Sequence, residues 1–178
     1  MKPQDITDFW LDLPDEVLFR ANDDFDAGLR SQFGDIHAVA VAGELDDWAQ
    51  TRDGRLALIL LLDQMSRNLK RGTPAMFAAD KKALALAVRA IELGDDALGD
   101  PSLKRWYYMP FMHSELLADQ ERCVELCSQP GMEATLPFAI EHRDIIARFG
   151  RFPHRNKVLG RPMRDQEQAY LDKGGFVG

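Results

Sequence analysis

The stretch Leu56-Ala57-Leu58-Ile59-Leu60-Leu61-Leu62 is followed directly by Asp63-Gln64-Met65-Ser66-Arg67-Asn68. The first half is apolar on every side, and a helix without a polar face must be wrapped by other elements. In the second half Asp63 and Arg67 are four residues apart, as are Gln64 and Asn68, so they form neighbouring rows on one helix face. The sequence therefore predicts a buried central helix that ends in a polar pocket or a polar knot.

The rest of the chain is consistent with one all-α domain over residues 1–178. Hydrophobic residues make up 46% and charged residues 29%, an ordinary composition for a globular protein. Helical periods recur, and no stretch shows the alternation of a half-buried strand. The longest apolar run is far shorter than the roughly 20 residues that span a bilayer. Because the start, Met1–Asp5, is too polar for a leader sequence, we expect a cytoplasmic protein without a membrane partner.

Caps, glycines and prolines divide the chain into expected helices. Gly34 is expected to close one helix and Gly43 the next, while Pro110 suits the first turn of a long helix. Short consecutive helices predict antiparallel pairs packed around the central helix. The expected helices cover residues 6–10, 22–33, 35–43, 55–71, 75–93, 110–129, 137–149 and 165–171.

Polar residues interrupt the apolar stripes of two expected helices. One stripe holds His113, Leu116, Gln120, Cys123 and Cys127, and the other holds Phe138, His142, Ile145 and Phe149. A buried polar group without a partner costs on the order of 1–3 kcal/mol, and the polar end of the central helix can supply partners. Each histidine alone suits a satisfied core residue. Together with Asp63, Gln64, Arg67 and Asn68 they form a cluster with room for a ligand.

Basic residues are concentrated in one segment of an otherwise acidic chain. Residues 1–50 hold twelve acids and three bases, whereas residues 148–164 hold six bases and no acid. Arginine binds carboxylate and phosphate in a bidentate manner, so Arg148, Arg151, His154, Arg155 and Asn156 form a candidate anion site. The alternative is that these arginines pair with carboxylates of the acidic half. We expect no nucleic-acid partner, because the remaining surface is anionic.

Motifs for other chemistry do not occur. There is no HExxH, no CxxC pair, no phosphate-binding GxxxxGK[ST] and no GxGxxG, so we predict neither a metal nor a cofactor. Ser66 and Ser114 lack any nucleophile motif. His113 beside Glu115 or Asp119 could perform acid–base chemistry, although no pattern singles out that role.

Three blocks carry a resemblance to a known family. They are LALILLLDQMSRNLKRG (Leu56–Gly72), PFMHSELLADQ (Pro110–Gln120) and HRDIIARFGRFPHRNKVLGR (His142–Arg161). Together they resemble an uncharacterised bacterial family, domain of unknown function 924. The resemblance implies a tetratricopeptide-like superhelix of packed helix pairs. It implies no catalytic residue, because the family has no assigned activity.

Three functions remain open at this point. The protein is expected to be a helical binding module for an anionic small molecule or peptide. Alternatively, it is an enzyme that acts on a phosphorylated or carboxylated metabolite through a histidine, or a structural protein whose polar cluster is an internal network. The oligomeric state is not predicted. The candidate ligand-binding residues are Asp63, Gln64, Arg67, Asn68, His113, Gln120, His142, Arg148, Arg151, His154, Arg155 and Asn156.

Overall fold

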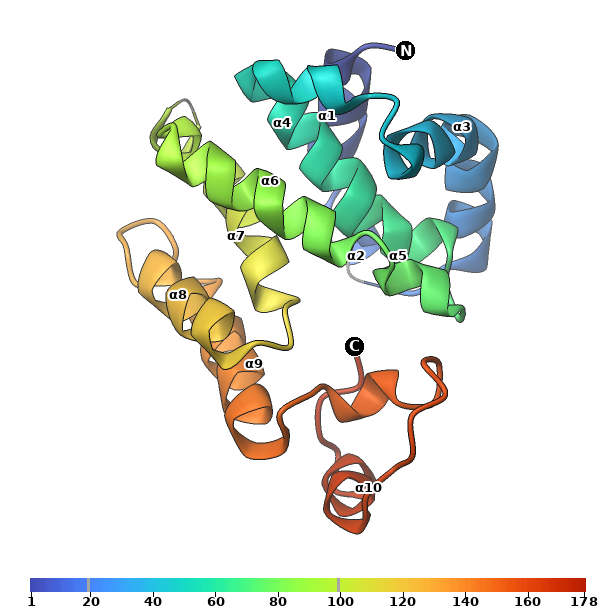
Figure 1. The fold of residues 1–178 in the computed structure, drawn as a ribbon, viewed down its shortest axis with the longest axis vertical. Helices are drawn as coiled ribbons and strands as arrows, with labels where there is room; N and C mark the ends of the chain where they lie inside the picture. Colours follow the sequence, from blue (N-terminus) through green and yellow to red (C-terminus); the bar gives the residue numbers. More distant parts are fainter. Residues whose placement is uncertain (19, 99) are drawn as a thin grey trace.

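The computed structural model describes residues 1–18, 20–98 and 100–178, and these residues form an all-α fold without strands (Figure 1). The α-helices are α1 (Pro3–Leu11), α2 (Asp15–Leu18), α3 (Asp23–Ala42), α4 (Arg52–Ile59), α5 (Ser66–Leu69), α6 (Asp80–Glu92), α7 (Lys104–Met112), α8 (Leu117–Cys127), α9 (Leu136–Phe149) and α10 (Asp165–Asp172). Short 3-10 turns lie at Asp46–Gln50, Pro74–Phe77, Asp95–Ala97, Pro101–Leu103 and Pro153–Arg155. No helix in these ranges is long and apolar enough to cross a membrane.

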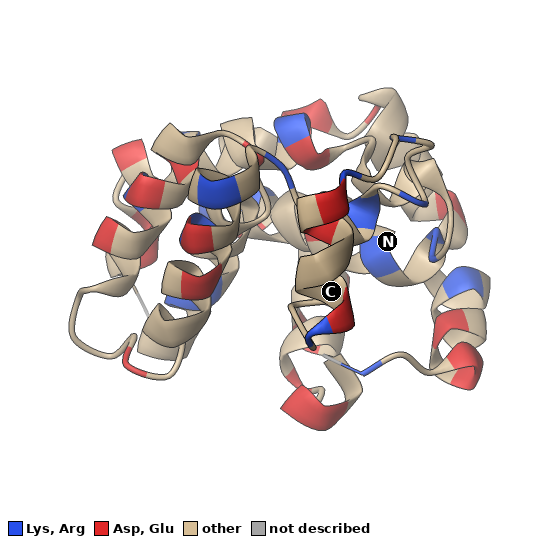
Figure 2. Ribbon diagram, turned by 90° about the horizontal axis from the view of Figure 1, so that it is seen from below, with Lys and Arg blue, Asp and Glu red and all other residues tan. Residues whose placement is uncertain are grey.

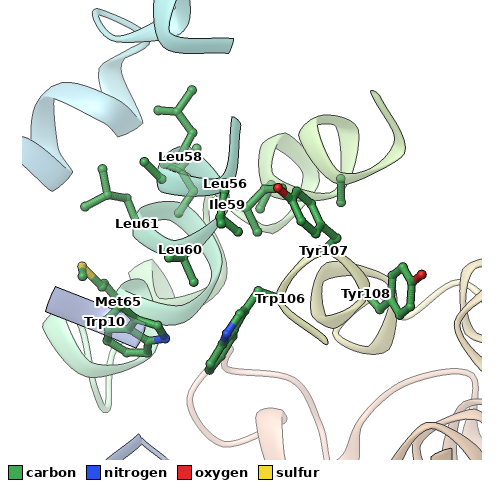
Figure 3. Close-up of a cluster of buried hydrophobic side chains, with 14 of the residues drawn as sticks. Trp10, Leu56, Leu58, Ile59, Leu60, Leu61, Met65, Trp106, Tyr107 and Tyr108 are labelled. Carbon is green, nitrogen blue, oxygen red and sulfur yellow. The ribbon is translucent and has the colours of Figure 1, made fainter. Parts of the chain in front are cut away.

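The expected central helix is present and buried. It is built from α4, the π-helical stretch Leu60–Met65 and α5, and it packs against α1, α3, α6 and α7 (Figure 1). Every residue of Leu56–Leu62 is buried. Trp10 of α1 and Trp106 of α7 meet edge to face beside this helix, with ring centroids 6.2 Å apart (Figure 3). Helices on all sides thus remove the apolar half from water, which is its main source of stability.

The π-helical stretch Leu60–Met65 was not predicted from the sequence. A π turn adds a residue to the helical turn, and such turns are frequent at functional sites. Just after it, the Ser66 hydroxyl donates a hydrogen bond to the Leu62 carbonyl at 2.7 Å. The buried His37 Nε2 lies 2.8 Å from the same hydroxyl oxygen. The widened turn is therefore held by side-chain contacts at the point where the helix becomes polar.

The helix break expected at Gly34 is wrong. Helix α3 runs through this glycine without interruption, and it ends instead at Gly43, which has a left-handed φ of 89°. Its buried stripe of Leu29, Phe33 and His37 continues across Gly34 in helical register. Burial of this continuous stripe outweighs the modest cost of a glycine inside a helix.

The long helix expected from Pro110 to Gln129 is also wrong. Pro110 lies inside α7, which ends at Met112, and α8 begins at Leu117. Pro110 therefore does not begin a helix, and α7 ends two residues after it. His113 therefore lies in the turn between α7 and α8, and Leu116 is 66% exposed rather than part of a buried stripe.

The other expected stripe is buried only in part. Phe138 is 57% exposed, whereas Ile145 and Phe149 are buried together with Ile146 and Phe152. Tyr170 of α10 and Phe176 pack against this group, which forms a second, smaller apolar cluster at the end of α9. The basic segment after α9 is consequently folded against the helical body rather than extended from it.

The continuity of α3 can be tested with two glycine substitutions. A Cβ at Gly34 would have open space around it, whereas Gly43 holds a positive φ. We expect Gly34→Ala to raise the free energy of unfolding by about 0.5–1 kcal/mol, and Gly43→Ala to lower it by about 1 kcal/mol or more. Urea unfolding followed by circular dichroism measures both. A larger loss for Gly34→Ala than for Gly43→Ala would contradict an unbroken helix.

Candidate functional site

The carboxylate of Asp63 is the buried centre of a polar cluster at the end of the central helix. None of its surface is exposed. It lies 2.8 and 2.9 Å from Nδ1 of His113, accepts the Gln64 amide at 2.6 Å, and stands 3.6 Å from Arg67. Burial would raise the pKa of Asp63, but the charges of His113 and Arg67 and the Gln64 hydrogen bond lower it below its usual value. Asp63 is therefore an ionised carboxylate inside the protein.

His113 is held in one orientation by this carboxylate. A carboxylate only accepts hydrogen bonds, so Nδ1 of His113 is the donor in its contact with Asp63. The side chain keeps 16% of its surface exposed. Gln120 fixes the turn that carries His113, because its amide donates to the carbonyls of Met112 and Ser114 at 2.7 and 2.6 Å. His113 is therefore an imidazole of fixed orientation that keeps part of its surface exposed.

Arg67 and Arg155 come from opposite halves of the chain and share two neighbours. Arg67 donates to both Asp80 oxygens at 2.8 and 3.0 Å, and also to the Met76 carbonyl. Nη1 of Arg155 lies 3.5 Å from Asp80 Oδ2. Both guanidinium groups stack on Phe77, at 4.9 Å for Arg67 and 4.6 Å for Arg155. The basic segment therefore meets the polar end of the central helix at Arg155.

Arg155 itself is a buried cation with few polar contacts. It is 6% exposed, and its guanidinium lies between the rings of Phe77 and Phe152, 4.6 and 4.5 Å from their centroids. Its Nε–H is buried and meets no hydrogen-bond acceptor among residues 1–18, 20–98 and 100–178. Burial, together with the charge of Arg67, lowers the pKa of Arg155 to about 10. A cation in such surroundings is costly unless an anion accompanies it.

His142 and His154 lie beside Arg155 but are held neutral. Nδ1 of His142 donates a hydrogen bond to the Phe138 carbonyl of its own helix, at 2.8 Å. The ring of Phe176 packs against both histidines, at 4.5 and 5.2 Å. Burial lowers the pKa of His142 to about 4 and that of His154 to about 3. These two rings therefore line the cluster without adding charge.

Glu115 is a member of the cluster that was not among the candidate residues. Its carboxylate accepts two hydrogen bonds from Arg161, at 2.6 and 2.9 Å, and one from the Phe152 backbone at 2.7 Å. Burial would raise the pKa of Glu115, but the Arg161 and Phe152 hydrogen bonds lower it. Glu115 stands two residues after His113 in one of the family blocks, which was an available signal. Asp80 and Phe77 had none, because nothing in the local sequence sets them apart.

Several candidate residues lie in other contacts. Asn68 donates to Asp26 at 2.9 Å, together with Arg71. Arg151 forms two hydrogen bonds with the buried Glu167, at 2.6 and 2.8 Å, and Asn156 donates to the same carboxylate at 3.1 Å. Arg148 stacks on Phe149 and Tyr170. The cluster thus retains Asp63, Gln64, Arg67, His113, Gln120, His142, His154 and Arg155 from the candidate set.

Two surface hollows lie away from this cluster. One of about 380 Å³ is lined by Arg148, Phe149, Arg164 and the first residues of α10, and one of about 550 Å³ runs between α9 and Tyr170. Acidic and basic residues are interleaved along the helices rather than gathered on one face (Figure 2). In the described part of the chain, no group of three or more His, Cys, Asp and Glu is placed to hold a metal ion. The chemistry is concentrated at Asp63, His113 and Arg155.

The fold and the cluster together define an all-α protein with a buried carboxylate–histidine pair beside a stacked arginine. The chain belongs to the bacterial family of proteins of unknown function DUF924, which matches residues 6–175. It is similar to the solved structure of the Agrobacterium tumefaciens protein ATU0120, described as a protein of unknown function. The two are 41% identical, the match covers 97% of each chain, and the TM-score is 0.91. Comparison with curated proteins gave no match.

The role of Asp63 in holding the cluster can be tested by Asp63→Asn. Asparagine carries no charge to neutralise Arg67, and it has one acceptor oxygen for His113 where aspartate has two. We therefore expect a loss of about 3 kcal/mol or more in the free energy of unfolding. The matched control is Asp46→Asn, because Asp46 is 62% exposed and pairs with Lys82. That control should cost less than about 1 kcal/mol in urea unfolding. Equal losses in the two variants would count against a central role for Asp63.

The Glu167 contacts predict a defined pH dependence. Hydrogen bonds from Arg151, acting against burial, lower the pKa of Glu167 from 4.5 to about 2. A lowered pKa in the folded state adds stability above pH 4.5 and loses it as the pH falls toward 2. We expect Glu167→Gln to be less stable than the wild type at neutral pH, and the difference to shrink across this interval. Thermal unfolding at a series of pH values measures it, and a difference that stays constant would contradict the assignment.

Proposed function

We propose that the cluster at the end of the central helix binds a small molecule or peptide that carries a carboxylate or phosphate. The observation that supports this proposal is Arg155, a buried guanidinium with an unpartnered Nε–H and one carboxylate oxygen at 3.5 Å. An internal network accounts for Arg67 and Arg161, whose guanidinium groups form two hydrogen bonds each with a carboxylate. It leaves Arg155 without such a partner.

The stacking of Arg155 restricts how a ligand would approach. Phe77 and Phe152 flank the guanidinium, so its in-plane N–H donors are the groups left for a ligand. Planar, two-oxygen acceptors such as carboxylates and phosphates suit this edge. Burial is the main cause of the lowered pKa of His142, and His113 and Arg155 both lie close enough to His142 to lower it further. The proposed ligand would therefore lie at the edge of Arg155, with His113 close by. As the sequence predicts, we expect this binding to serve a cytoplasmic role.

An enzyme is the second candidate, and the Asp63–His113 pair favours it. An ionised carboxylate at 2.8 Å from Nδ1 orients the imidazole and stabilises its protonated form. Nε2 would then exchange a proton with a ligand held by Arg155. Under this alternative the substrate is a carboxylated or phosphorylated metabolite, and His113 is the general acid–base. The binding proposal does not depend on this step.

Anion binding can be tested with Arg155→Met. Methionine fills similar space without charge, and Asp80, which lies 3.5 Å from Arg155, keeps its two hydrogen bonds from Arg67. We expect inorganic phosphate, sulfate or malonate to stabilise the wild type by about 2.7 kcal/mol at a hundredfold excess over Kd, and to have no effect on the variant. Thermal unfolding with and without each anion measures this difference.

The matched control for that experiment is Arg122→Met. Arg122 is 43% exposed on α8 and pairs with Glu125, outside the cluster. It should respond to the anions as the wild type does. The proposal fails if none of the three anions stabilises the wild type, or if Arg155→Met responds as strongly as Arg122→Met.

A further inference from the structure

The proposed anion site is covered in this structure. Arg155 is 6% exposed, and its unpartnered Nε–H is buried. An anion from solvent can therefore reach this guanidinium only if a neighbouring part of the protein moves. The proposed function thus requires a segment that opens, and the packing around Arg155 identifies one.

Residues 173–178 follow α10 and return toward the turn Pro153–Arg155, where they form a strap over two rings of the cluster (Figure 1). The ring of Phe176 packs against His142 and His154, with centroids 4.5 and 5.2 Å apart. Gly178 lies beside His154 as well, since a Cβ on this glycine would stand 3.2 Å from the imidazole. The strap therefore covers the side of the cluster that these two histidines line.

The rings under the strap connect it to Arg155. The ring of Phe152 lies 5.5 Å from those of both His142 and His154. The guanidinium of Arg155 stacks on Phe152 at 4.5 Å. Phe176 is therefore the outer layer of a group of rings whose inner member contacts the arginine.

The strap is held more weakly than the rings that it covers. Among the described residues, each of its hydrogen bonds goes to α10 and none goes to the cluster. The shortest joins the Phe176 N–H to the Tyr170 hydroxyl at 2.9 Å. Phe176 is only partly buried, whereas Phe152 beneath it is fully buried. A segment with few buried contacts opens locally at a low cost in free energy.

We infer that the strap must leave the cluster before an oxyanion binds at Arg155, and that the closed strap keeps the affinity of the site low. This inference rests on the proposed function and specifies its regulation. Because only molecules with an open strap bind, the apparent affinity is the intrinsic affinity multiplied by the open fraction. Any change that withdraws Phe176 from the two histidines therefore raises the affinity for the anion.

The test compares Phe176→Ala with Val177→Ala, both in the full chain, by isothermal titration with sulfate. Val177 is the matched control, because it lies in the same strap and is 72% exposed. We expect Phe176→Ala to bind sulfate more tightly than the wild type, by about tenfold if roughly one wild-type molecule in ten is open. Val177→Ala should bind sulfate as the wild type does.

Tyr170→Phe loosens the strap by a second route. It removes the hydroxyl that accepts the Phe176 N–H and keeps the ring that packs on Phe149. We expect a smaller gain in sulfate affinity in the same direction. This variant decides the question if Phe176→Ala does not fold.

Labelling of His142 by diethyl pyrocarbonate tests the strap without an anion. Nδ1 of His142 donates to the Phe138 carbonyl, so Nε2 is the nitrogen left to react. We expect the label to form faster in Phe176→Ala than in the wild type or Val177→Ala. His37 is the internal control, because it is buried against Ser66 and makes no contact with the strap, and it should be labelled equally in all three proteins.

The outcomes separate the strap from the proposed function. A sulfate affinity that is unchanged or lower in Phe176→Ala overturns the strap and leaves anion binding intact. Unchanged labelling of His142 in Phe176→Ala overturns the strap too, whether or not an anion binds. Failure of sulfate, phosphate and malonate to bind any of these proteins overturns the proposed function, and the inference with it.

Discussion

A carboxylate wholly removed from water is the constraint around which this protein is arranged. Asp63 carries a charge inside an apolar body, and a buried charge is tolerated only when partners surround it. Its partners are Gln64 and Arg67 on the same helix and His113 on a distant turn. The turn is fixed in its place by Gln120. The end of the central helix, the α7–α8 turn and the basic segment are thus tied to one point.

The basic segment illustrates how the acidic chain uses its arginines. Arg161 pairs with Glu115 and attaches the C-terminal part to the helical body, whereas Arg151 pairs with Glu167 of α10 inside that part. The arginines of the segment thus do pair with carboxylates, but neither of these partners belongs to the acidic first 50 residues. Arg155 has no comparable partner and lies between two phenyl rings, and the proposed anion site rests on it.

Much of the fold could be predicted from the sequence, and its errors have physical causes. The apolar run Leu56–Leu62 required a buried helix, and the structure has one. The helix boundaries expected at Gly34 and Pro110 were wrong because local helix propensity contributes less than the burial of apolar side chains. The buried stripe of α3 continues past Gly34, and buried aromatic residues hold α7 in place before Pro110. The tetratricopeptide-like arrangement remains a prediction.

The candidate site was predictable where polar residues interrupt apolar patterns. Asp63, His113 and His142 stood out in this way. Asp80 did not, because its role depends on Arg155 far along the chain, and no periodicity reports such a contact. Glu115 was visible only as a neighbour of His113 in a family block, and its pairing with Arg161 was not. The π turn was equally hidden, since it is stabilised by Ser66 and the distant His37. Contacts between distant segments set the chemistry here, and the sequence pattern records them only indirectly.

The most direct measurement of the central claim is the protonation pattern of His113 in the ligand-free protein. Nitrogen chemical shifts from 15N-edited NMR at neutral pH distinguish the two ring nitrogens. If the buried Asp63 carboxylate organises the site, Nδ1 of His113 carries a proton and donates it in a hydrogen bond to Asp63. A His113 ring protonated at Nε2 alone, with a free Nδ1 facing Asp63, would contradict the account.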